Sequence, residues 1–135
     1  MLKGSCINPK LLSALAHCGH GDKVLIADGN YPLASKTNGA ELVYLGMMPG
    51  TPTVTQVLEA VQSVANIERA EVMDPGDGTQ PEIFGTFREM LGGMELEKLS
   101  RSDFYEACCR QDIRLAISTG EKRTFANLLI TVGVA

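Results

Sequence analysis

Two histidines stand close together in the chain, and their neighbours suggest different chemistry for each. His20 lies between Gly19 and Gly21 and precedes Asp22. Imidazoles titrate near neutral pH, and a glycine-flanked turn leaves the ring open to a ligand, so the pattern favours proton transfer at His20. An ordinary surface-turn histidine explains the same pattern equally well. His17 is expected in the last turn of a helix, where a partly charged ring suits the helix dipole.

A metal site at the two histidines is not expected. His17 and His20 are three residues apart, but Cys18 and Gly19 interrupt the helix between them. No further histidine or carboxylate stands at ligand spacing, whereas zinc sites combine several donors in a fixed geometry. The residues therefore predict no metal.

Asp28 and Asn127 are the polar residues best placed to hold a ligand. Asp28 follows an apolar run at residues 23–27, and open α/β sheets bind ligands beyond the carboxyl ends of such strands. Its carboxylate can accept hydrogen bonds from two adjacent hydroxyls. Asn127 begins the last apolar run and offers a donor and an acceptor. The alternative role of Asp28 is to close a turn with Gly29.

Helices and strands alternate in the pattern around these residues. Helices are expected at 9–18, 54–64, 83–91 and 103–107, and strands at 23–27, 41–45, 67–73, 113–118 and 127–134. Asn8 with Pro9, Thr53 with Gln56, and Ser102 supply the helix caps. The alternation predicts one α/β domain over residues 1–135, with a largely parallel central sheet flanked by helices. Alternatively, the last two strands, at 113–118 and 127–134, pair with each other as an antiparallel hairpin.

Charge and hydropathy exclude several classes of protein. The 135 residues include 12 Lys and Arg against 16 Asp and Glu, a formal net charge of −4, so no nucleic-acid partner is expected. No run of 18 apolar residues and no apolar signal core follows Met1, which predicts a cytoplasmic protein without a membrane partner. The cysteines, including adjacent Cys108 and Cys109, are expected as free thiols. No glycine-rich phosphate cradle is present.

Two segments together carry a family resemblance. Residues 19–32 read GHGDKVLIADGNYP, and residues 119–127 read TGEKRTFAN. Both resemble the signatures of the L-fucose mutarotase and D-ribose pyranase family, and the resemblance covers most of the chain, least at residues 34–52. It implies an α/β fold, no cofactor, and interconversion of the cyclic forms of a free monosaccharide, either α and β anomers or pyranose and furanose rings.

The resemblance also implies roles for individual residues. It makes His20 the proton donor and assigns sugar contacts to Asp28, Arg101, Phe125, Ala126 and Asn127. The residues that follow His20 and Asp28 are more similar to the fucose branch of the family than to the ribose branch. Arg101 agrees with this, because the ribose branch tends to have histidine at that position. L-fucose is therefore the expected substrate.

Phe125 departs from the family pattern, which usually has a tyrosine at this position. The ring can still stack on the apolar side of a sugar, but the phenolic hydroxyl is missing. The loss of this hydroxyl leaves three alternatives open: the activity is reduced, the substrate is different, or another tyrosine (Tyr31, Tyr44 or Tyr105) supplies the hydroxyl.

The separation of His20 and Asp28 predicts an assembly of several copies. At about 3.3 Å per residue, an extended strand at 23–27 would place them roughly 20 Å apart. Either this strand is shorter, or each site combines His20 of one subunit with Asp28 or Asn127 of a neighbour. Family members resembling this chain form rings with sites at subunit interfaces, which implies a homo-oligomer, a pentamer or a decamer.

Three alternatives to a fucose mutarotase follow from the same residues. Because the tyrosine hydroxyl is missing at Phe125, the protein is alternatively a non-catalytic monosaccharide-binding or regulatory protein. The ribose branch suggests an activity of the D-ribose pyranase type. A small redox or metal protein built on Cys108 and Cys109 is the third alternative.

Overall fold

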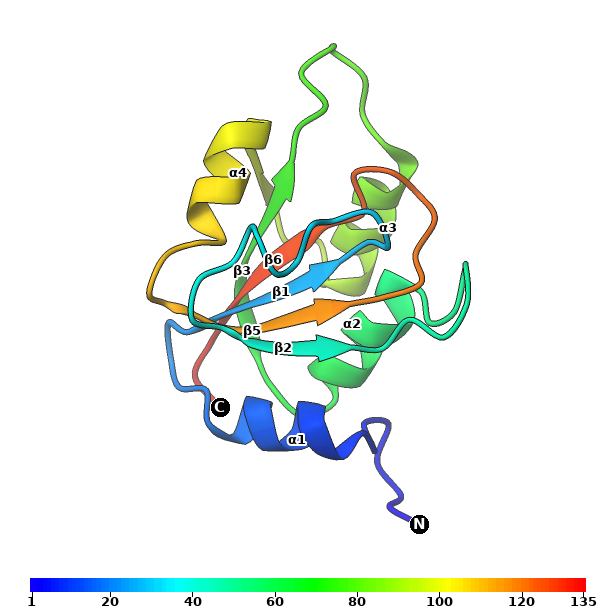
Figure 1. Cartoon of the computed structure of the whole chain (residues 1–135), viewed down its shortest axis with the longest axis vertical. Helices are drawn as coiled ribbons and strands as arrows, with labels where there is room; N and C mark the ends of the chain where they lie inside the picture. Colours follow the sequence, from blue (N-terminus) through cyan, green and yellow to red (C-terminus); the bar gives the residue numbers. More distant parts are fainter.

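A six-stranded sheet forms the centre of the computed structural model, which describes residues 1–135 (Figure 1). The strands are β1 (Lys23–Ala27), β2 (Glu41–Tyr44), β3 (Ile67–Met73), β4 (Leu96–Leu99), β5 (Ile113–Ser118) and β6 (Leu128–Val132). Their order in space is β2-β5-β1-β6-β3-β4. All neighbours run parallel except β6, which lies antiparallel between β1 and β3. The predicted, mostly parallel sheet is therefore confirmed, with one reversed strand inside it.

The last two strands do not form a hairpin, so that alternative is wrong. β1 lies between β5 and β6. Hairpin loops have about 2–5 residues, and the longer connection at residues 119–127 crosses the carboxyl end of β1 instead. There Thr119 donates to the Ala27 carbonyl from its N–H at 3.2 Å and from its hydroxyl at 2.8 Å. This crossing brings the connection next to Asp28.

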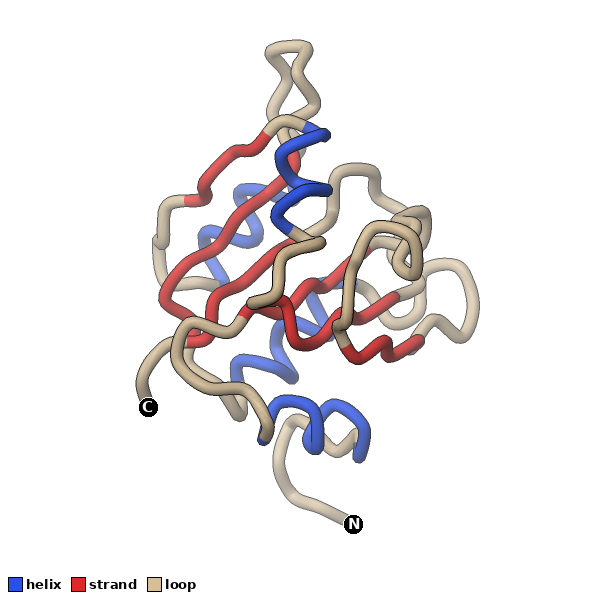
Figure 2. The backbone as a smooth tube through the Cα atoms, turned by 60° about the vertical axis from the view of Figure 1, so that its left-hand side comes forward, coloured by secondary structure: helices blue, strands red, loops and turns tan.

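Helices cover the two faces of the sheet unequally. They are α1 (Pro9–Ala16), α2 (Val54–Gln62), α3 (Glu82–Met90) and α4 (Arg101–Ala107), and none is long and apolar enough to cross a membrane. The first three join a large apolar cluster with Val24 and Ile26 of β1, whereas α4 packs with Leu25 and Ala27 on the opposite face. Figure 2 shows α4 in front of the strands and α2 and α3 behind them. Both faces of β1 are therefore covered, which explains its continuous apolar run.

The caps of α1 and α2 agree with the sequence. The Asn8 side chain accepts hydrogen bonds from the first backbone N–H groups of α1, and Pro9 is the first helical residue. Thr53 and Gln56 form the predicted capping box, each side chain bonded to the other residue's backbone N–H. Both helices are therefore defined by local chemistry.

One helix cap needs correction, and one strand lies where the sequence predicts none. The cap of α4 is Ser100, whose hydroxyl accepts from the Asp103 N–H at 3.2 Å, so the cap predicted at Ser102 is wrong and the helix begins at Arg101. Ser100 takes this role because its side chain reaches the N–H three residues further along. Strand β4 was not predicted, since an edge strand with exposed charged residues in its middle lacks the apolar pattern of a buried strand.

Candidate functional site

Asp28 and Asn127 bind each other at the carboxyl end of β1. The Asp28 N–H donates to Asn127 Oδ1 at 2.8 Å, and Asn127 Nδ2 donates to Asp28 Oδ2 at 3.1 Å. They meet because β6 runs antiparallel beside β1, so its start lies against the end of β1. Each residue is only 4% exposed. The reciprocal pair orients both side chains before any ligand arrives.

The Asp28 carboxylate also closes the turn that follows it. Oδ1 accepts from the Asn30 N–H at 2.9 Å, so the turn role coexists with the pairing to Asn127. Burial raises the pKa of Asp28, while hydrogen bonds from Asn30, Asn127, Tyr31 and Ala126 oppose the rise by stabilising the charged form. A carboxylate has about four lone-pair sites, so capacity remains for the hydroxyls of a ligand.

A cavity of about 220 Å³ opens beside this pair. Helix α4 contributes Arg101 and Tyr105, and the connection before β6 contributes Phe125. The full lining is Asp28, Asn30, Tyr31, Met73, Arg101, Tyr105, Thr124, Phe125 and Asn127. A carboxylate, a carboxamide, a guanidinium group and aromatic rings thus surround one small space. This combination suits a compact molecule with several hydroxyls and one apolar face.

Phe125 reaches the cavity through an unusual backbone conformation. Its φ is 58°, and no other residue except glycines has a positive φ. The left-handed region costs an L-residue about 1–2 kcal/mol, and such conformations persist where their surroundings enforce them. The next side chain, Ala126, is buried in the large apolar cluster and does not line the cavity. The contact of Ala126 with Asp28 is therefore made by its backbone and not by its side chain.

Glu121 anchors the connection that carries Phe125. Its carboxylate accepts hydrogen bonds from Arg123 Nε at 2.9 Å and Nη2 at 2.8 Å, and from the Val54 N–H at 3.2 Å. The side chain is 3% exposed. The hydrogen bonds from Arg123 lower the pKa of Glu121 to about 2. An ionised, buried carboxylate therefore ties this connection to the start of α2.

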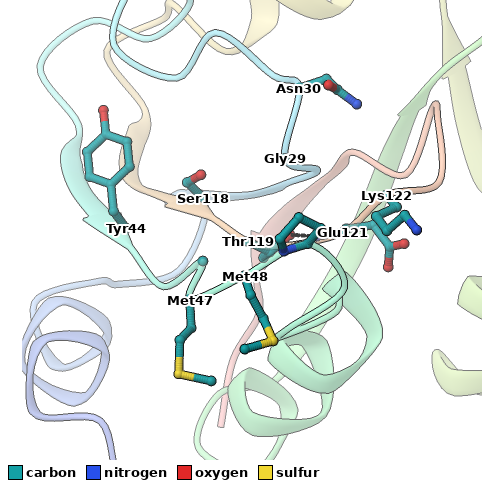
Figure 3. Close-up of a pocket in the computed structure, with 11 residues that line it drawn as sticks. Gly29, Asn30, Tyr44, Met47, Met48, Ser118, Thr119, Glu121 and Lys122 are labelled. Carbon is teal, nitrogen blue, oxygen red and sulfur yellow. Dashed lines mark hydrogen bonds between the residues drawn. The ribbon is translucent and has the colours of Figure 1, made fainter.

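A larger cavity of about 580 Å³ adjoins the same connection (Figure 3). Glu121 lines it together with Asn30, which also borders the smaller cavity. Figure 3 shows Met47 and Met48 next to each other at its edge. Tyr44, Met47 and Met48 are 63%, 73% and 56% exposed, so an apolar surface lies uncovered beside the Asp28 site in a single chain.

His20 lies at the opposite end of β1, outside the cavity of Asp28. It borders a separate cavity of about 380 Å³ near the end of α1 and the carboxyl end of β6, and no lining residue is common to both cavities. Its ring is 59% exposed and pairs with Glu68 at 2.9 Å. β1 spans the predicted residues Lys23–Ala27, so the shorter-strand alternative is excluded. One chain by itself therefore does not bring His20 and Asp28 together.

Several residues at these sites were not found from the sequence. Met73 lines the small cavity although nothing in the sequence indicates it, whereas Tyr31, also in the lining, is one of the tyrosines expected as a source of a hydroxyl. Tyr31 follows Asp28 within the recognisable segment, whereas Met73 ends a different strand and only the fold brings it there. Glu68, the partner of His20, lies 48 positions further along the chain, and nothing in the sequence indicates the pairing.

The three tyrosines differ in their access to the small cavity. The Tyr31 hydroxyl donates to the Lys36 carbonyl at 3.1 Å, and burial raises the pKa of Tyr31. Tyr44 borders the larger cavity instead. Tyr105 lines the small cavity and has no hydrogen-bonded partner for its hydroxyl. Of the three tyrosines, Tyr105 is therefore the best placed to supply a free hydroxyl there.

The cysteines are all free thiols, and no group of three or more His, Cys, Asp or Glu side chains is arranged to hold a metal ion. Cys108 is fully buried in the smaller apolar cluster. Burial raises the pKa of Cys108 to about 12, so its thiol stays protonated and unreactive at neutral pH. The structure therefore gives no support to a redox site at Cys108 and Cys109.

Known proteins resemble this chain over its whole length. The D-ribose pyranase of Pseudomonas entomophila is 32% identical over 137 aligned residues, which cover 99% of this chain and 98% of that protein. The fucose mutarotase of Streptococcus pneumoniae, solved with L-fucose, superposes with a TM-score of 0.81 at 29% identity, covering 96% of this chain and 94% of that one. Bacillus subtilis RbsD, solved with D-ribose, superposes with a TM-score of 0.86 at 26% identity, covering 100% and 99%. The sequence model of one family matches residues 1–135, and the chain belongs to the RbsD / FucU transport protein family.

Proposed function

We propose that this protein is an enzyme that interconverts the α and β anomers of a free monosaccharide, with L-fucose as the expected substrate. The observation that carries the proposal is the reciprocal Asp28–Asn127 pair at the wall of a small cavity. Its remaining lone pairs and donors suit neighbouring sugar hydroxyls, and Arg101 adds a fork of donors. Phe125 offers an aromatic face to the apolar side of the ring. No metal or cofactor takes part in this proposal.

Anomer exchange requires the bond between the anomeric carbon and the ring oxygen to break and re-form while a proton moves between the two oxygens on that carbon. In the proposed reaction, His20 takes the proton of the anomeric hydroxyl while the bond from that carbon to the ring oxygen breaks. The His20 imidazolium then gives this proton to the ring oxygen, the open-chain aldehyde forms, and rotation about its C1–C2 bond turns the other face of the carbonyl to the hydroxyl. Closure on the other face reverses both transfers and leaves the enzyme unchanged. A positioned acid and base contributes about 10²–10⁴-fold, which suffices because the reaction already proceeds in water.

Each site is proposed to combine two subunits of a homo-oligomeric ring, a pentamer or a decamer. His20 of one copy would complete the cavity lined by Asp28 and Asn127 of its neighbour. Two observations support this arrangement: His20 and Asp28 border different cavities within one chain, and Met47 and Met48 leave an apolar surface exposed beside the site. The free cysteines suit a reducing compartment, and we place the protein in the cytoplasm.

Exchange NMR on a series of sugars tests the function directly. The protein should accelerate exchange between the anomer signals of L-fucose more than those of D-ribose, D-arabinose or L-rhamnose. Faster exchange between pyranose and furanose signals of D-ribose would favour the D-ribose pyranase alternative, which the named relative from Pseudomonas entomophila supports. Shifted or broadened signals without faster exchange would indicate a sugar-binding or regulatory protein instead.

Subunit mixing tests the shared site. His20→Asn and Asp28→Ala variants should each be inactive as homo-oligomers. When the two are unfolded together and refolded in equal amounts, random assembly leaves about a quarter of the interfaces with both native residues. Recovery of exchange activity in the mixture supports the arrangement. An inactive mixture with intact oligomers would contradict it, as would full activity of an isolated monomer.

A further inference from the structure

We infer that Glu68 is a positioning residue for His20, holding the imidazole by Nε2 so that Nδ1 is the nitrogen that exchanges protons with the sugar. The inference rests on the proposed function and adds a residue to it. Both carboxylate oxygens of Glu68 lie within hydrogen-bond distance of His20 Nε2, Oε1 at 3.0 Å and Oε2 at 2.9 Å. Because a carboxylate only accepts, Nε2 must carry the hydrogen. His20 Nδ1 has no partner within the chain and remains free.

The backbone around the pair fixes both partners to the same end of the sheet. Gly21, next to His20, donates its N–H to the Val132 carbonyl at 2.9 Å, and Gly133 donates to the Asn66 carbonyl at 2.8 Å. Glu68 lies against Gly133, where an added Cβ would come within 3.2 Å of the Glu68 Cβ. The histidine turn and the start of β3 are thus both bonded to the end of β6. The pair is therefore a contact between two anchored segments.

Neighbouring charged groups leave Glu68 available to His20. Arg69, the adjacent cation, is bound by Glu97 of β4, with both carboxylate oxygens at 2.8 Å from Nη2. Asp22 is directed to the backbone, where it accepts from the Gly19 N–H at 2.8 Å. A carboxylate on one ring nitrogen selects the tautomer, orients the ring and stabilises the imidazolium that forms when the other nitrogen takes a proton. Glu68 is such a carboxylate, since both of its oxygens lie at His20 Nε2. It does not line the cavity of Asp28, so within the chain it contacts His20 and not the proposed sugar-binding residues.

The tautomers of the two histidines give a test that does not depend on activity. His17 Nδ1 lies 2.7 Å from the Ser13 carbonyl, so His17 must carry its hydrogen on Nδ1, the opposite of His20. Long-range ¹H–¹⁵N spectra of the neutral rings should therefore show two opposite tautomers. Glu68→Ala should move the His20 signals toward a mixture of tautomers and leave those of His17 in place. Glu82→Gln, which alters an exposed carboxylate at the start of α3, should change neither.

Kinetics then separate positioning from a general structural role. Glu68→Ala should lower kcat for anomer exchange about tenfold with KM changed less than about twofold, and Glu68→Asp should recover part of the loss. In the His20→Asn background, Glu68→Ala should have no further effect, because a residue that acts through His20 has nothing left to position. Glu82→Gln should keep wild-type kinetics.

The outcomes distinguish this inference from the proposed function. His20 signals that are identical in the wild type and in Glu68→Ala would overturn the inference, as would a His20 hydrogen on Nδ1. An equal loss from Glu68→Ala with and without His20 would also overturn it, because the effect would then not pass through the imidazole. A wild-type protein that does not accelerate exchange would refute the proposed function, and the tautomer spectra would still decide whether Glu68 holds His20.

Discussion

The two ends of β1 present their polar residues in opposite ways. At the carboxyl end, Asp28 and Asn127 are 4% exposed and exchange two hydrogen bonds. At the amino end, the His20 side chain is 59% exposed and has one partner, Glu68, which is itself 41% exposed. Buried polar groups must be satisfied within the chain, so their geometry is set on folding. An exposed pair contributes little to stability and leaves its residues accessible.

This difference shows how the work of the proposed site is divided. The carboxyl end holds the cavity that the proposed function assigns to sugar binding, and its Asp28–Asn127 hydrogen bonds are formed on folding. The amino end presents the exposed His20 ring, which the proposed function makes the proton-transfer group. Binding and proton transfer should therefore respond to mutation separately, and the following predictions test that separation.

The largest effect is expected from His20→Asn. Removing the imidazole should slow anomer exchange by about 10²–10⁴-fold with little loss of sugar affinity, because the residues proposed to hold the sugar, among them Asp28, Arg101 and Asn127, are unchanged. Exchange NMR measures the rate and titration calorimetry the affinity. His17→Asn is the matched control and should remain active. Wild-type exchange in His20→Asn would move the acid and base assignment to another residue.

The reverse pattern is expected from Asn127→Ala. The substitution leaves the Asp28 N–H and carboxylate without their partner in a buried place. An unsatisfied buried group costs about 1–3 kcal/mol, so stability should fall by that order and sugar affinity by about tenfold or more. Chemical denaturation and calorimetry check the two quantities. If affinity stayed at the wild-type value, Asn127 would be a purely structural residue and the contrast between the two ends would weaken.

A smaller, pH-dependent effect is expected from Glu121→Gln. The folded-state pKa of Glu121, about 2, lies below its ordinary value of 4.5, so its charge stabilises the fold above pH 4.5 and this contribution disappears as the pH falls toward 2. Because Arg123 is half exposed, the contribution is about 1–2 kcal/mol. Denaturation at pH 7 and at pH 3 should show the difference shrinking. Glu97→Gln, which breaks an exposed ion pair, should show little difference at either pH.

The smallest effect is expected from Phe125→Tyr. Tyrosine keeps the aromatic ring and the same backbone conformation and adds a hydroxyl at the cavity wall, so exchange should rise by about two- to fivefold. Phe125→Leu, which removes the aromatic face, should weaken sugar binding. Slower exchange in Phe125→Tyr would show that the cavity is adapted to phenylalanine and that a hydroxyl at this position is not needed.

Local patterns were sufficient for much of the fold. The apolar run at β1, the capping box of Thr53 and Gln56, and the alternation of helices and strands depend on neighbours in the chain, and the structure agrees with them. The edge strand β4 and the antiparallel insertion of β6 were missed. The order of the strands depends on how the helices and strands pack together in three dimensions. A short apolar run in the sequence indicates that a strand is buried but not which strands lie beside it.

The sequence by itself determined the types of groups in this protein: an imidazole in a glycine-flanked turn, and a carboxylate and a carboxamide at the ends of two buried runs. Tertiary structure alone decided which of them meet. It paired Asp28 with Asn127 across 99 residues and His20 with Glu68 across 48, and it placed His20 at a different cavity from that of Asp28 and Asn127. The physical reason is that hydrogen bonds act over about 3 Å, so chemistry between distant residues exists only once the sheet has brought their strands together.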